Sequence, residues 1–205
     1  MNLYSRDFLE MGRMPHECVF GTFERFPNSG KDRFRVRENK NPHLRWTDLP
    51  SETRSIALIC DDLDAADVDQ AEYTSGTVSR DVKRRAHCHW VLIDVPVEIG
   101  SIANGEFSNG VFIGGKPGPE AQYGSRQGLN EFTQFLAKDP MMSGDYYGYD
   151  GPCPPFGADP HRYRFTVYAL AERRLSKIQG AFTKEDVLTA AAELILDQAS
   201  ITGCF

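Results

Sequence analysis

The sequence predicts a predominantly β protein with peripheral helices. Eighteen glycines and 12 prolines interrupt the chain at short intervals, which favours strands joined by loops over stacked helices. Three apolar or alternating segments have the length of strands, and the clearest helical periodicity lies near the C-terminal end. With 205 residues and 40% apolar composition, residues 1–205 are expected to form a single domain around one core.

Three segments carry the strand prediction. Ser55–Cys60 is a short apolar run between turn-forming residues and a cluster of aspartates, as expected for a buried strand. His89–Val95 is a second apolar segment and ends before Pro96. Tyr163–Leu170 alternates aromatic or aliphatic residues with polar ones, which indicates a strand with one buried face. We expect these three strands to form the central sheet.

The helix signals come late in the chain. Thr183 is a candidate N-cap, Asp186 completes a capping pattern, and apolar residues recur at helical spacing until Gly203. An amphipathic helix is therefore predicted from Thr183 to about Ser200. A shorter helix is predicted at Asn130–Ala137, inside a long loop over residues 114–149 that is rich in Gly, Pro and Tyr.

The charge balance argues against broad contact with nucleic acid. The formal net charge is −6 and the isoelectric point is about 5.4, whereas phosphate binding draws on an excess of Lys and Arg. The basic runs Arg33–Lys40 and Lys83–Arg85 carry too little charge to change this, and they are predicted to be solvated loops.

Cellular location is predicted from the cysteines and the apolar segments. The five cysteines are odd in number and lack a repeated short spacing, so they are expected to be reduced thiols in a cytoplasmic protein. The first residues show no export signal. No segment approaches the roughly 18 apolar residues of a membrane span, so we expect peripheral membrane contact at most.

Polar residues that suit a binding site gather at the predicted strand ends. Within His87–Trp90, side-chain alternation places the two histidines on one face, and Cys88 and Trp90 on the other. His161 and Tyr163 likewise share a face. If these strand ends are neighbours of the segment that carries Asp62, a carboxylate, imidazoles and a phenol lie close together at one end of the sheet.

Such a cluster suits a small anion. Imidazole N–H and phenol O–H groups donate hydrogen bonds to anion oxygens, and a carboxylate fixes the protonation of an adjacent histidine. Asp62 itself repels an anion unless a proton lies between them, so affinity is expected to fall as pH rises. The Gly151–Pro155 stretch is expected to form a wall, because Gly allows close backbone approach and Pro stiffens the loop.

Four blocks along the chain resemble the signature of the phosphatidylethanolamine-binding, or Raf-kinase-inhibitor-like, family. They are Asp62-Leu63-Asp64-Ala65, His89-Trp90, Gly151–Pro155 and His161-Arg162-Tyr163, and they occur in the family's order. Asn39–Trp46 resembles the family's early segment, so the similarity spans residues 39 to 170. The long 114–149 loop and the cysteine in Gly-Pro-Cys-Pro-Pro look most like the bacterial branch.

The resemblance implies a central antiparallel sheet packed against a second sheet, and a shallow pocket for phosphate or carboxylate head groups. Carried over by motif, the pocket residues are Asp62, Ala65, His89, Gly151, Pro152, Pro154, Pro155, His161 and Tyr163. His87 stands where a large aromatic is common and is a candidate wall residue.

The resemblance also implies what kind of protein this is. It implies a non-enzymatic protein that binds a phosphate- or carboxylate-bearing small molecule or lipid head group, without a cofactor or metal. A protein partner such as a kinase or protease, and a homodimer, are compatible with it.

Two features depart from the family's pattern. Leu63 and Ala66 stand where prolines are usual, and both changes loosen the segment that presents the acids. Residues 67–86 are polar and predict an exposed excursion that covers or flanks the pocket.

Other interpretations stay open. His87, His89 and His161 with Asp62 offer ligands that zinc accepts. An enzyme is the alternative function, with His161 or His89 as general base and Asp62 as its orienting carboxylate, acting as a hydrolase or lyase.

For several of the remaining candidates a structural explanation is preferred. Asp61 is expected in a solvated turn, and His16 and His43 are expected to be structural residues. Cys153 is the thiol worth testing.

Overall fold

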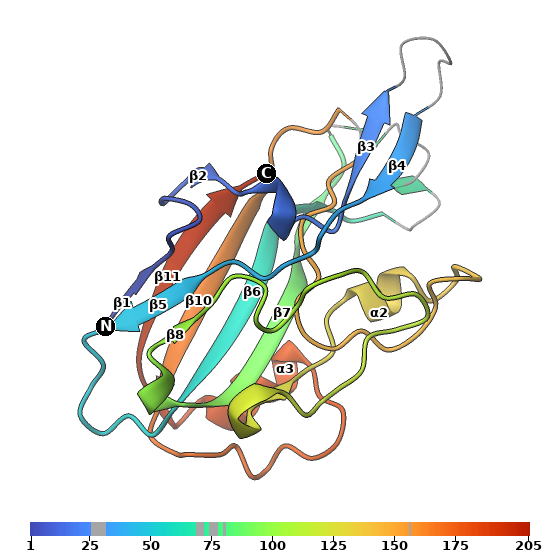
Figure 1. The fold of residues 1–205 in the computed structure, drawn as a ribbon. Coiled ribbons are helices and arrows are strands. Elements are labelled where there is room, and N and C mark those ends of the chain that lie inside the picture. Colours follow the sequence, from blue (N-terminus) through green and yellow to red (C-terminus); the bar gives the residue numbers. More distant parts are fainter. Residues whose placement is uncertain (26–31, 69–71, 74–77, 80, 156) are drawn as a thin grey trace.

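The centre of the protein is a six-stranded sheet with the order β2-β11-β10-β6-β7-β9 (Figure 1). The computed structural model describes residues 1–25, 32–68, 72–73, 78–79, 81–155 and 157–205. The strands of this sheet are β2 (Gly12–Arg13), β6 (Ser55–Ala66), β7 (Arg84–Pro96), β9 (Arg126–Gln127), β10 (Arg162–Leu170) and β11 (Ile195–Cys204).

The three predicted core strands are confirmed and lie side by side. β10 pairs antiparallel with β6, and β6 pairs antiparallel with β7, so that Cys60 lies between Phe165 and Trp90. β6 and β7 are longer than predicted, because both continue beyond the apolar segments into the polar ends that carry the aspartates and histidines. The sheet is antiparallel except at β2, which runs parallel to β11.

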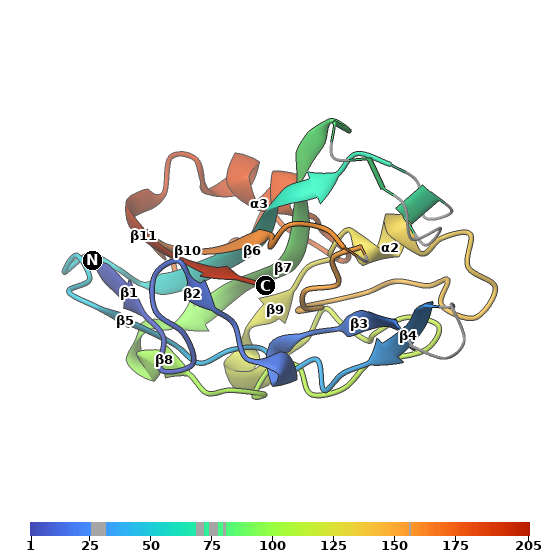
Figure 2. The same cartoon turned by 90° about the horizontal axis from the view of Figure 1, so that it is seen from above.

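A second sheet covers one face of the central sheet, as the resemblance implied. It contains β1 (Asn2–Tyr4), β5 (Leu44–Thr47) and β8 (Ser101–Ile102), in the order β1-β5-β8. Viewed from above, this sheet and helix α3 (Lys184–Ala191) lie on opposite sides of β6 and β10 (Figure 2). The fold is therefore layered, with the central sheet in the middle.

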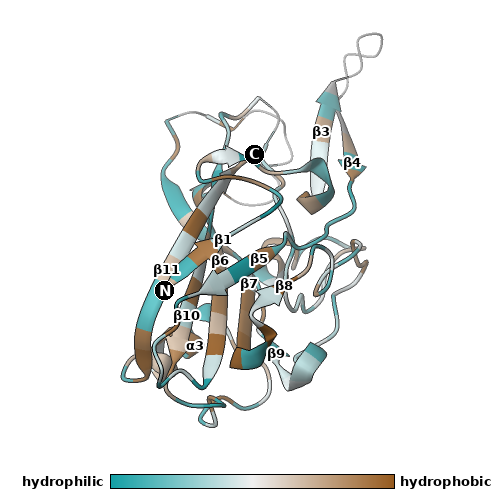
Figure 3. Cartoon of the chain, turned by 60° about the vertical axis from the view of Figure 1, so that its left-hand side comes forward, coloured by the Kyte–Doolittle hydropathy of each residue, from teal (hydrophilic) through white to brown (hydrophobic). Residues whose placement is uncertain are grey.

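Two hydrophobic clusters fill the spaces between these layers. The first includes Trp46 of β5 and Trp90 and Phe165 of the central sheet, all nearly inaccessible to solvent. The second joins the opposite face of the sheet to α3 through Val187 and Ala191. Full burial of one such large side chain contributes about 1.5–3 kcal/mol. Figure 3 shows the matching concentration of hydrophobic residues on β6 and β7.

The hairpin of β3 (Gly21–Arg25) and β4 (Asp32–Val36) projects from this body (Figure 1). The prediction of a solvated loop at Arg33–Lys40 is therefore wrong for its first part, which is strand. The same holds for Arg84 and Arg85, which begin β7.

The C-terminal helix begins where the sequence predicts and ends early. The Thr183 side chain accepts from Asp186 N–H, and Asp186 accepts in return from Thr183 N–H, which completes the predicted capping box. The predicted end near Ser200 is wrong, because the helix stops at Ala191 and β11 follows. β11 pairs with the whole length of β10 and satisfies the backbone groups along that edge.

The long 114–149 loop contains short elements. They are the 3-10 helix η3 (Gln122–Gly124), β9 and helix α2 (Phe132–Phe135), the last within the predicted Asn130–Ala137 segment. Two further 3-10 turns are η1 (His16–Cys18) and η2 (Val97–Ile99). Among the described residues, none of the helices has the length and apolarity needed to span a bilayer.

Candidate functional site

Three polar side chains meet across adjacent strands at one end of the central sheet. Tyr163 on β10 is directly opposite Asp62 on β6, and Asp62 is directly opposite His87 on β7. Directly paired residues in antiparallel strands project from the same face. The strand register therefore brings together residues that lie between 25 and 101 positions apart in the sequence.

A β-bulge at His89 changes the face on which the next residues lie. Cys60 pairs with Trp90 and Asp61 pairs with Cys88, so His89 is an extra residue on β7. Cys88 consequently packs in the cluster on the α3 side, while Trp90 packs between the two sheets. The prediction that Cys88 and Trp90 share a face is wrong, because the simple alternation of a regular strand is interrupted here.

His161 and Asp62 form a buried pair. Nδ1 of His161 lies 2.7 Å from Oδ2 of Asp62, and both side chains are about 5% exposed or less. The other Asp62 oxygen accepts a hydrogen bond from Asp64 N–H at 2.8 Å. The carboxylate thus holds the Nδ1 proton of His161, which directs Nε2 away from the pair.

Two polar atoms beside this pair lack partners. Nε2 of His161 and the hydroxyl of Tyr163 are buried and make no hydrogen bond within the described residues. Asp62 is near enough to contribute to a raised pKa of the Tyr163 phenol, whose main cause is burial, but no hydrogen bond joins them. The other two such atoms belong to His43 and Trp46, in or next to β5.

His89 is fixed through the backbone of Asp150. Nδ1 of His89 lies 2.6 Å from the Asp150 carbonyl oxygen, and Asp150 N–H donates to the His89 carbonyl at 3.0 Å. The carbonyl oxygen requires a proton on Nδ1, so Nε2 of His89 is the nitrogen left for a ligand. The ring stands edge-on to Tyr163, with ring centroids 5.3 Å apart.

A buried ion pair fixes Asp150, whose carbonyl oxygen contacts His89, and the sequence did not indicate this pair. The Asp150 carboxylate is inaccessible to solvent and lies 2.8 Å from Nζ of Lys116. Side-chain amides of Asn39 and Asn130 also donate to it, at 2.7 and 2.8 Å. Lys116 additionally donates to the Tyr149 carbonyl. The aspartate thereby locks the backbone that holds His89.

A small cavity of about 40 Å³ lies beside this cluster, and its lining includes Asp62 and His89 but not the predicted site residues His161 and Tyr163. One water needs about 10–15 Å³, so a group of a few heavy atoms fits. Asp62, His87 and His89 form its polar side, and Ala65, which was predicted at the rim, also lines it. Its other side is apolar and consists of Ala66, Val68, Tyr73, Phe132, Phe135 and Cys153, with Arg85 as the cationic lining residue among those described.

The excursion over residues 67–86 flanks the cavity, as predicted. Val68 and Tyr73 line the cavity, and the Tyr73 hydroxyl donates to the Cys153 carbonyl at 2.5 Å. Residues 69–71, 74–77 and 80 of this excursion lie outside the described part of the chain.

The Gly151–Pro155 stretch is placed partly beside the cavity and partly elsewhere. Cys153 is its member in the cavity lining. Gly151 N–H donates to the Asn39 side-chain oxygen at 2.8 Å, and the Pro152 carbonyl accepts from Phe20 N–H. Pro154 and Pro155 line a separate groove with Phe23 and Phe205.

Burial controls the protonation of several groups around the cavity. It lowers the pKa of His87 well below the ordinary histidine value, and the nearby His89 and Arg85 lower it further. It raises the pKa of the Cys153 thiol to about 12. His87 is therefore neutral near pH 7, and Cys153 is a thiol rather than a thiolate.

The other aspartates of this segment are paired. Asp61 was expected in a solvated turn, but it lies in β6 and binds Nζ of Lys184 at 2.9 Å. Asp64 receives two hydrogen bonds from the Arg162 guanidinium, at 2.7 and 2.9 Å. Among the described residues, no group of three or more His, Cys, Asp or Glu side chains has an arrangement that would hold a metal ion.

Comparison with known proteins agrees with this fold. The phosphatidylethanolamine-binding protein family model matches residues 5–205. The chain belongs to the phosphatidylethanolamine-binding protein family. A UPF0098 protein of Methanothermobacter thermautotrophicus is 33% identical over 205 residues, covering 100% of this chain and 98% of the relative.

Bacterial members of the phosphatidylethanolamine-binding protein family are also similar. The UPF0098 protein YbhB of Escherichia coli is 29% identical over 181 residues, covering 88% of this chain and 85% of YbhB. The crystal structure of E. coli YbcL superposes with a TM-score of 0.66 at 21% identity, covering 100% of this chain and 96% of YbcL. The predicted fold class and the bacterial YbhB/YbcL-type relationship are thus confirmed.

Proposed function

We propose that this member of the family is a non-enzymatic binding protein whose pocket accepts a small phosphate- or carboxylate-bearing group, such as a lipid head group. The observation that carries the proposal is the pair of buried, unpartnered atoms at His161 Nε2 and Tyr163 Oη. Leaving a buried polar group unpaired costs about 1–3 kcal/mol, and a ligand oxygen removes that cost by accepting from the Tyr163 hydroxyl, or from Nε2 when the His161 ring carries a second proton.

The orientation of both histidines supports an anion as the ligand. Nδ1 of His161 is committed to Asp62, and Nδ1 of His89 is committed to the Asp150 carbonyl. In the neutral state both rings therefore present an Nε2 lone pair, which repels an anion. Protonation converts each Nε2 into a donor, so binding takes up protons and weakens as pH rises.

The proposal is tested by NMR of the imidazole groups during titration with inorganic phosphate and with acetate. Shifts of the His89 and His161 signals, with an affinity that is higher at pH 6 than at pH 8, are expected. The exposed His16 is the internal control, because its signal should not follow the same binding curve. If the His89 and His161 signals do not move with either anion, the proposal fails.

The His161–Asp62 pair also favours a second candidate, a hydrolase or lyase with His161 as general base. A base oriented by a carboxylate is a recurrent catalytic arrangement. The thiol nearest to the cavity, Cys153, is protonated at neutral pH and does not supply a nucleophile. Turnover of a panel of small phosphorylated or carboxylated compounds, abolished by His161→Ala, would establish this activity.

A cytoplasmic location, a protein partner and a homodimer complete the proposal. Cell fractionation tests the location, and light scattering of the purified protein tests the oligomeric state. A kinase or protease partner is tested by whether anion binding at His161 changes the activity of a candidate enzyme.

A further inference from the structure

We propose that the outer edge of β4 is a docking site for an extended segment of a partner protein in which acidic and apolar residues alternate. The segment adds to the β3–β4 hairpin as a third, antiparallel strand. The inference goes beyond the proposed function, because the edge lies on the projecting hairpin (Figure 1) and is separate from the described residues of the cavity.

The backbone of β4 has hydrogen-bonding groups that face away from β3. Arg37 N–H donates to the Phe20 carbonyl at 2.9 Å, so these two residues are a directly bonded pair in the register of the hairpin. Bonded positions alternate along an antiparallel pair with positions whose N–H and C=O point outward. Arg35 therefore bonds to β3, whereas the backbone groups of Phe34 and Val36 point to the outer edge.

This edge is covered at one end and open along Phe34–Val36. The Glu38 carbonyl has the same outward orientation and accepts from Gly110 N–H at 2.7 Å. Within the described ranges, β3 is the only strand that pairs with β4, and no backbone group from outside the hairpin bonds to Phe34 or Val36. An open strand edge is a template for pairing with another chain.

One face of the open edge is apolar and partly exposed. Phe34 is 44% exposed and Val36 is 54% exposed. The Phe34 ring lies between two other rings, with centroids 5.3 Å from Phe23 and 6.2 Å from the buried Phe20. Directly opposite residues of paired strands share a face. Apolar residues of an added strand, placed opposite Phe34 and Val36, therefore extend this aromatic row outward.

The other face of the edge is basic. Glu24 binds Nη2 of Arg37 at 2.5 Å, and its second oxygen lies 3.9 Å from Nη1 of Arg35. Two guanidinium groups thus share one carboxylate, and the Arg35 side chain is 62% exposed. An acidic residue opposite Arg35 on an added strand complements this charge.

A second copy of the chain is a poor occupant of this edge. An antiparallel register that joins Phe34 or Val36 to either of these residues in a second copy places Arg35 opposite an arginine, at position 33, 35 or 37. Like charges in directly opposite positions destabilise a strand pair. The charge pattern therefore favours a partner segment of opposite charge over self-association.

Binding of three acetylated and amidated peptides at low ionic strength tests the proposal. Glu-Val-Glu-Val-Glu is the probe, Lys-Val-Lys-Val-Lys reverses its charge, and Glu-Ser-Glu-Ser-Glu removes its apolar side chains. The probe should bind about tenfold more tightly than either control peptide. It should also shift the NMR signals of the Phe34 and Val36 amides and slow their hydrogen exchange, whereas the Arg35 amide, already bonded to β3, should change less.

Methylation of peptide nitrogens distinguishes strand addition from charge attraction alone. Residues opposite Phe34 and Val36 share their face and direct N–H toward β4, so these are the valines of the probe. N-methylvaline at both positions should therefore abolish binding. N-methylglutamate at the central position should be tolerated, because that N–H points away from β4.

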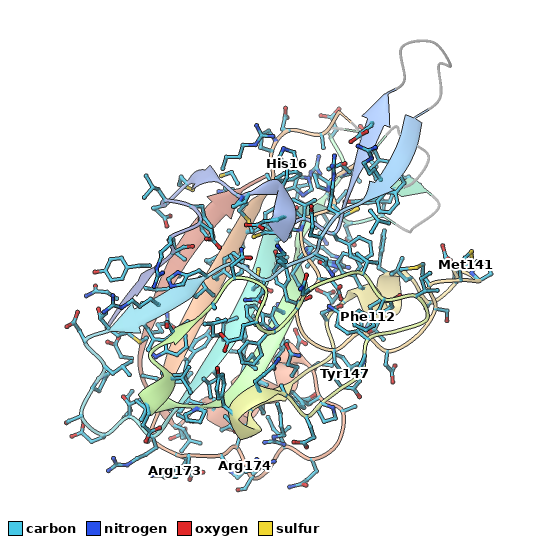
Figure 4. All side chains as sticks on the ribbon, in the orientation of Figure 1. His16, Phe112, Met141, Tyr147, Arg173 and Arg174 are labelled. Carbon is cyan, nitrogen blue, oxygen red and sulfur yellow. The ribbon has the colours of Figure 1, made fainter. Side chains whose placement is uncertain are left out.

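Arg35→Glu provides the matched variant and should reverse the preference between the glutamate and lysine peptides. Arg173→Glu is the control, because Arg173 is an exposed arginine at the opposite end of the molecule (Figure 4), and the preference should stay unchanged. Arg35→Gln replaces the glutamate variant if the amide signals show that the hairpin is lost, and it should weaken binding of the probe.

Three outcomes would overturn the inference. Equal affinities for the probe and the serine peptide, or a probe that still binds with both valines methylated, would show attraction of any polyanion to the arginines. Protection of the Phe34 and Val36 amides that rises with protein concentration alone would identify a second copy as the occupant. The readout is local to the hairpin, so each result is independent of the anion pocket.

Discussion

Lys116 and Asp150 form an ion pair that is almost completely inaccessible to solvent, with Nζ 2.8 Å from Oδ1. The carbonyl oxygen of the same aspartate holds Nδ1 of His89 at 2.6 Å. The long loop that carries Lys116 and the strand that carries His89 are therefore coupled through one residue. Burying two charges costs free energy, and the attraction between Lys116 and Asp150 offsets this cost only while both charges are present.

Loss of Lys116 should destabilise the fold strongly. Lys116→Met leaves Asp150 as a buried charge without its cationic partner, so the free energy of unfolding should fall by about 3–5 kcal/mol. Urea denaturation measures this change. Adding Asp150→Asn should restore part of the loss, because the uncompensated charge disappears, and Lys138→Met on the surface should change stability by less than about 0.5 kcal/mol. Additive effects of the two substitutions would contradict the coupling.

The carboxylate of Asp62 should promote anion binding through His161. Asp62→Asn removes the carboxylate that lies 2.7 Å from Nδ1 of His161 and orients the ring, so the affinity for acetate should fall about tenfold. NMR titration of the variant and of the unmodified protein measures the loss. Asp64→Asn removes the same charge two residues away, where Asp64 binds Arg162 at the surface, and should have little effect. An equal loss of affinity in the two variants would mean that Asp62 acts only as a nearby negative charge and not through its contact with His161.

His87 should make the protein less stable in acid. Its folded-state pKa is lowered from the ordinary value of 6.5 by burial, so the unfolded chain takes up the proton first. Stability is therefore lost as pH falls below 6.5, by up to about 1.4 kcal/mol per pH unit from this group.

His87→Phe tests this effect, because phenylalanine fills the site without titrating. The free energy of unfolding from urea titrations at pH 7 and pH 5.5 should differ less in this variant than in the unmodified protein. His16→Phe, at an exposed histidine, should leave the pH dependence unchanged. An unaltered acid slope in His87→Phe would show that the ring is protonated without penalty in the folded protein.

The capping box of α3 should contribute measurably to stability. Thr183→Ala removes the side-chain oxygen that accepts from Asp186 N–H, and a loss of about 1 kcal/mol is expected in thermal or urea unfolding. Ser200→Ala, on an exposed position of β11, is the matched control. No difference between the two variants would mean that the Asp186 side chain alone caps the helix.

The central strands were predictable because their signal is local. Ser55–Cys60 and Tyr163–Leu170 carry the apolar run or the alternation of a strand within the segment itself. The end of α3 was not predictable in this way. Leu194 and Ile195 continue the helical spacing of apolar residues. In the structure, however, the half-buried Ile195, Asp197 and Ala199 alternate with exposed residues as in a strand, because β11 pairs with β10.

The candidate site was predictable only as a set of residue types. Motif order and alternation bring Asp62, His161 and Tyr163 together, and the strand register agrees with that expectation. The bulge at His89 depends on how β6 pairs with β7, which a single strand does not encode. The Lys116–Asp150 pair joins residues that are 34 positions apart. Lys116 lies in a loop rich in Gly and Pro, and no local pattern there indicates that its side chain is buried.

The extra residue at His89 divides β7 into two segments with independent side-chain patterns. From Trp90 onward the side chains of β7 alternate between the two hydrophobic clusters, whereas Arg85 and His87 line the cavity. A protein engineer could therefore randomise Arg85 and His87 to retarget the ligand without redesigning the interior. The same separation would let natural variants diversify their recognition chemistry while the scaffold stays constant.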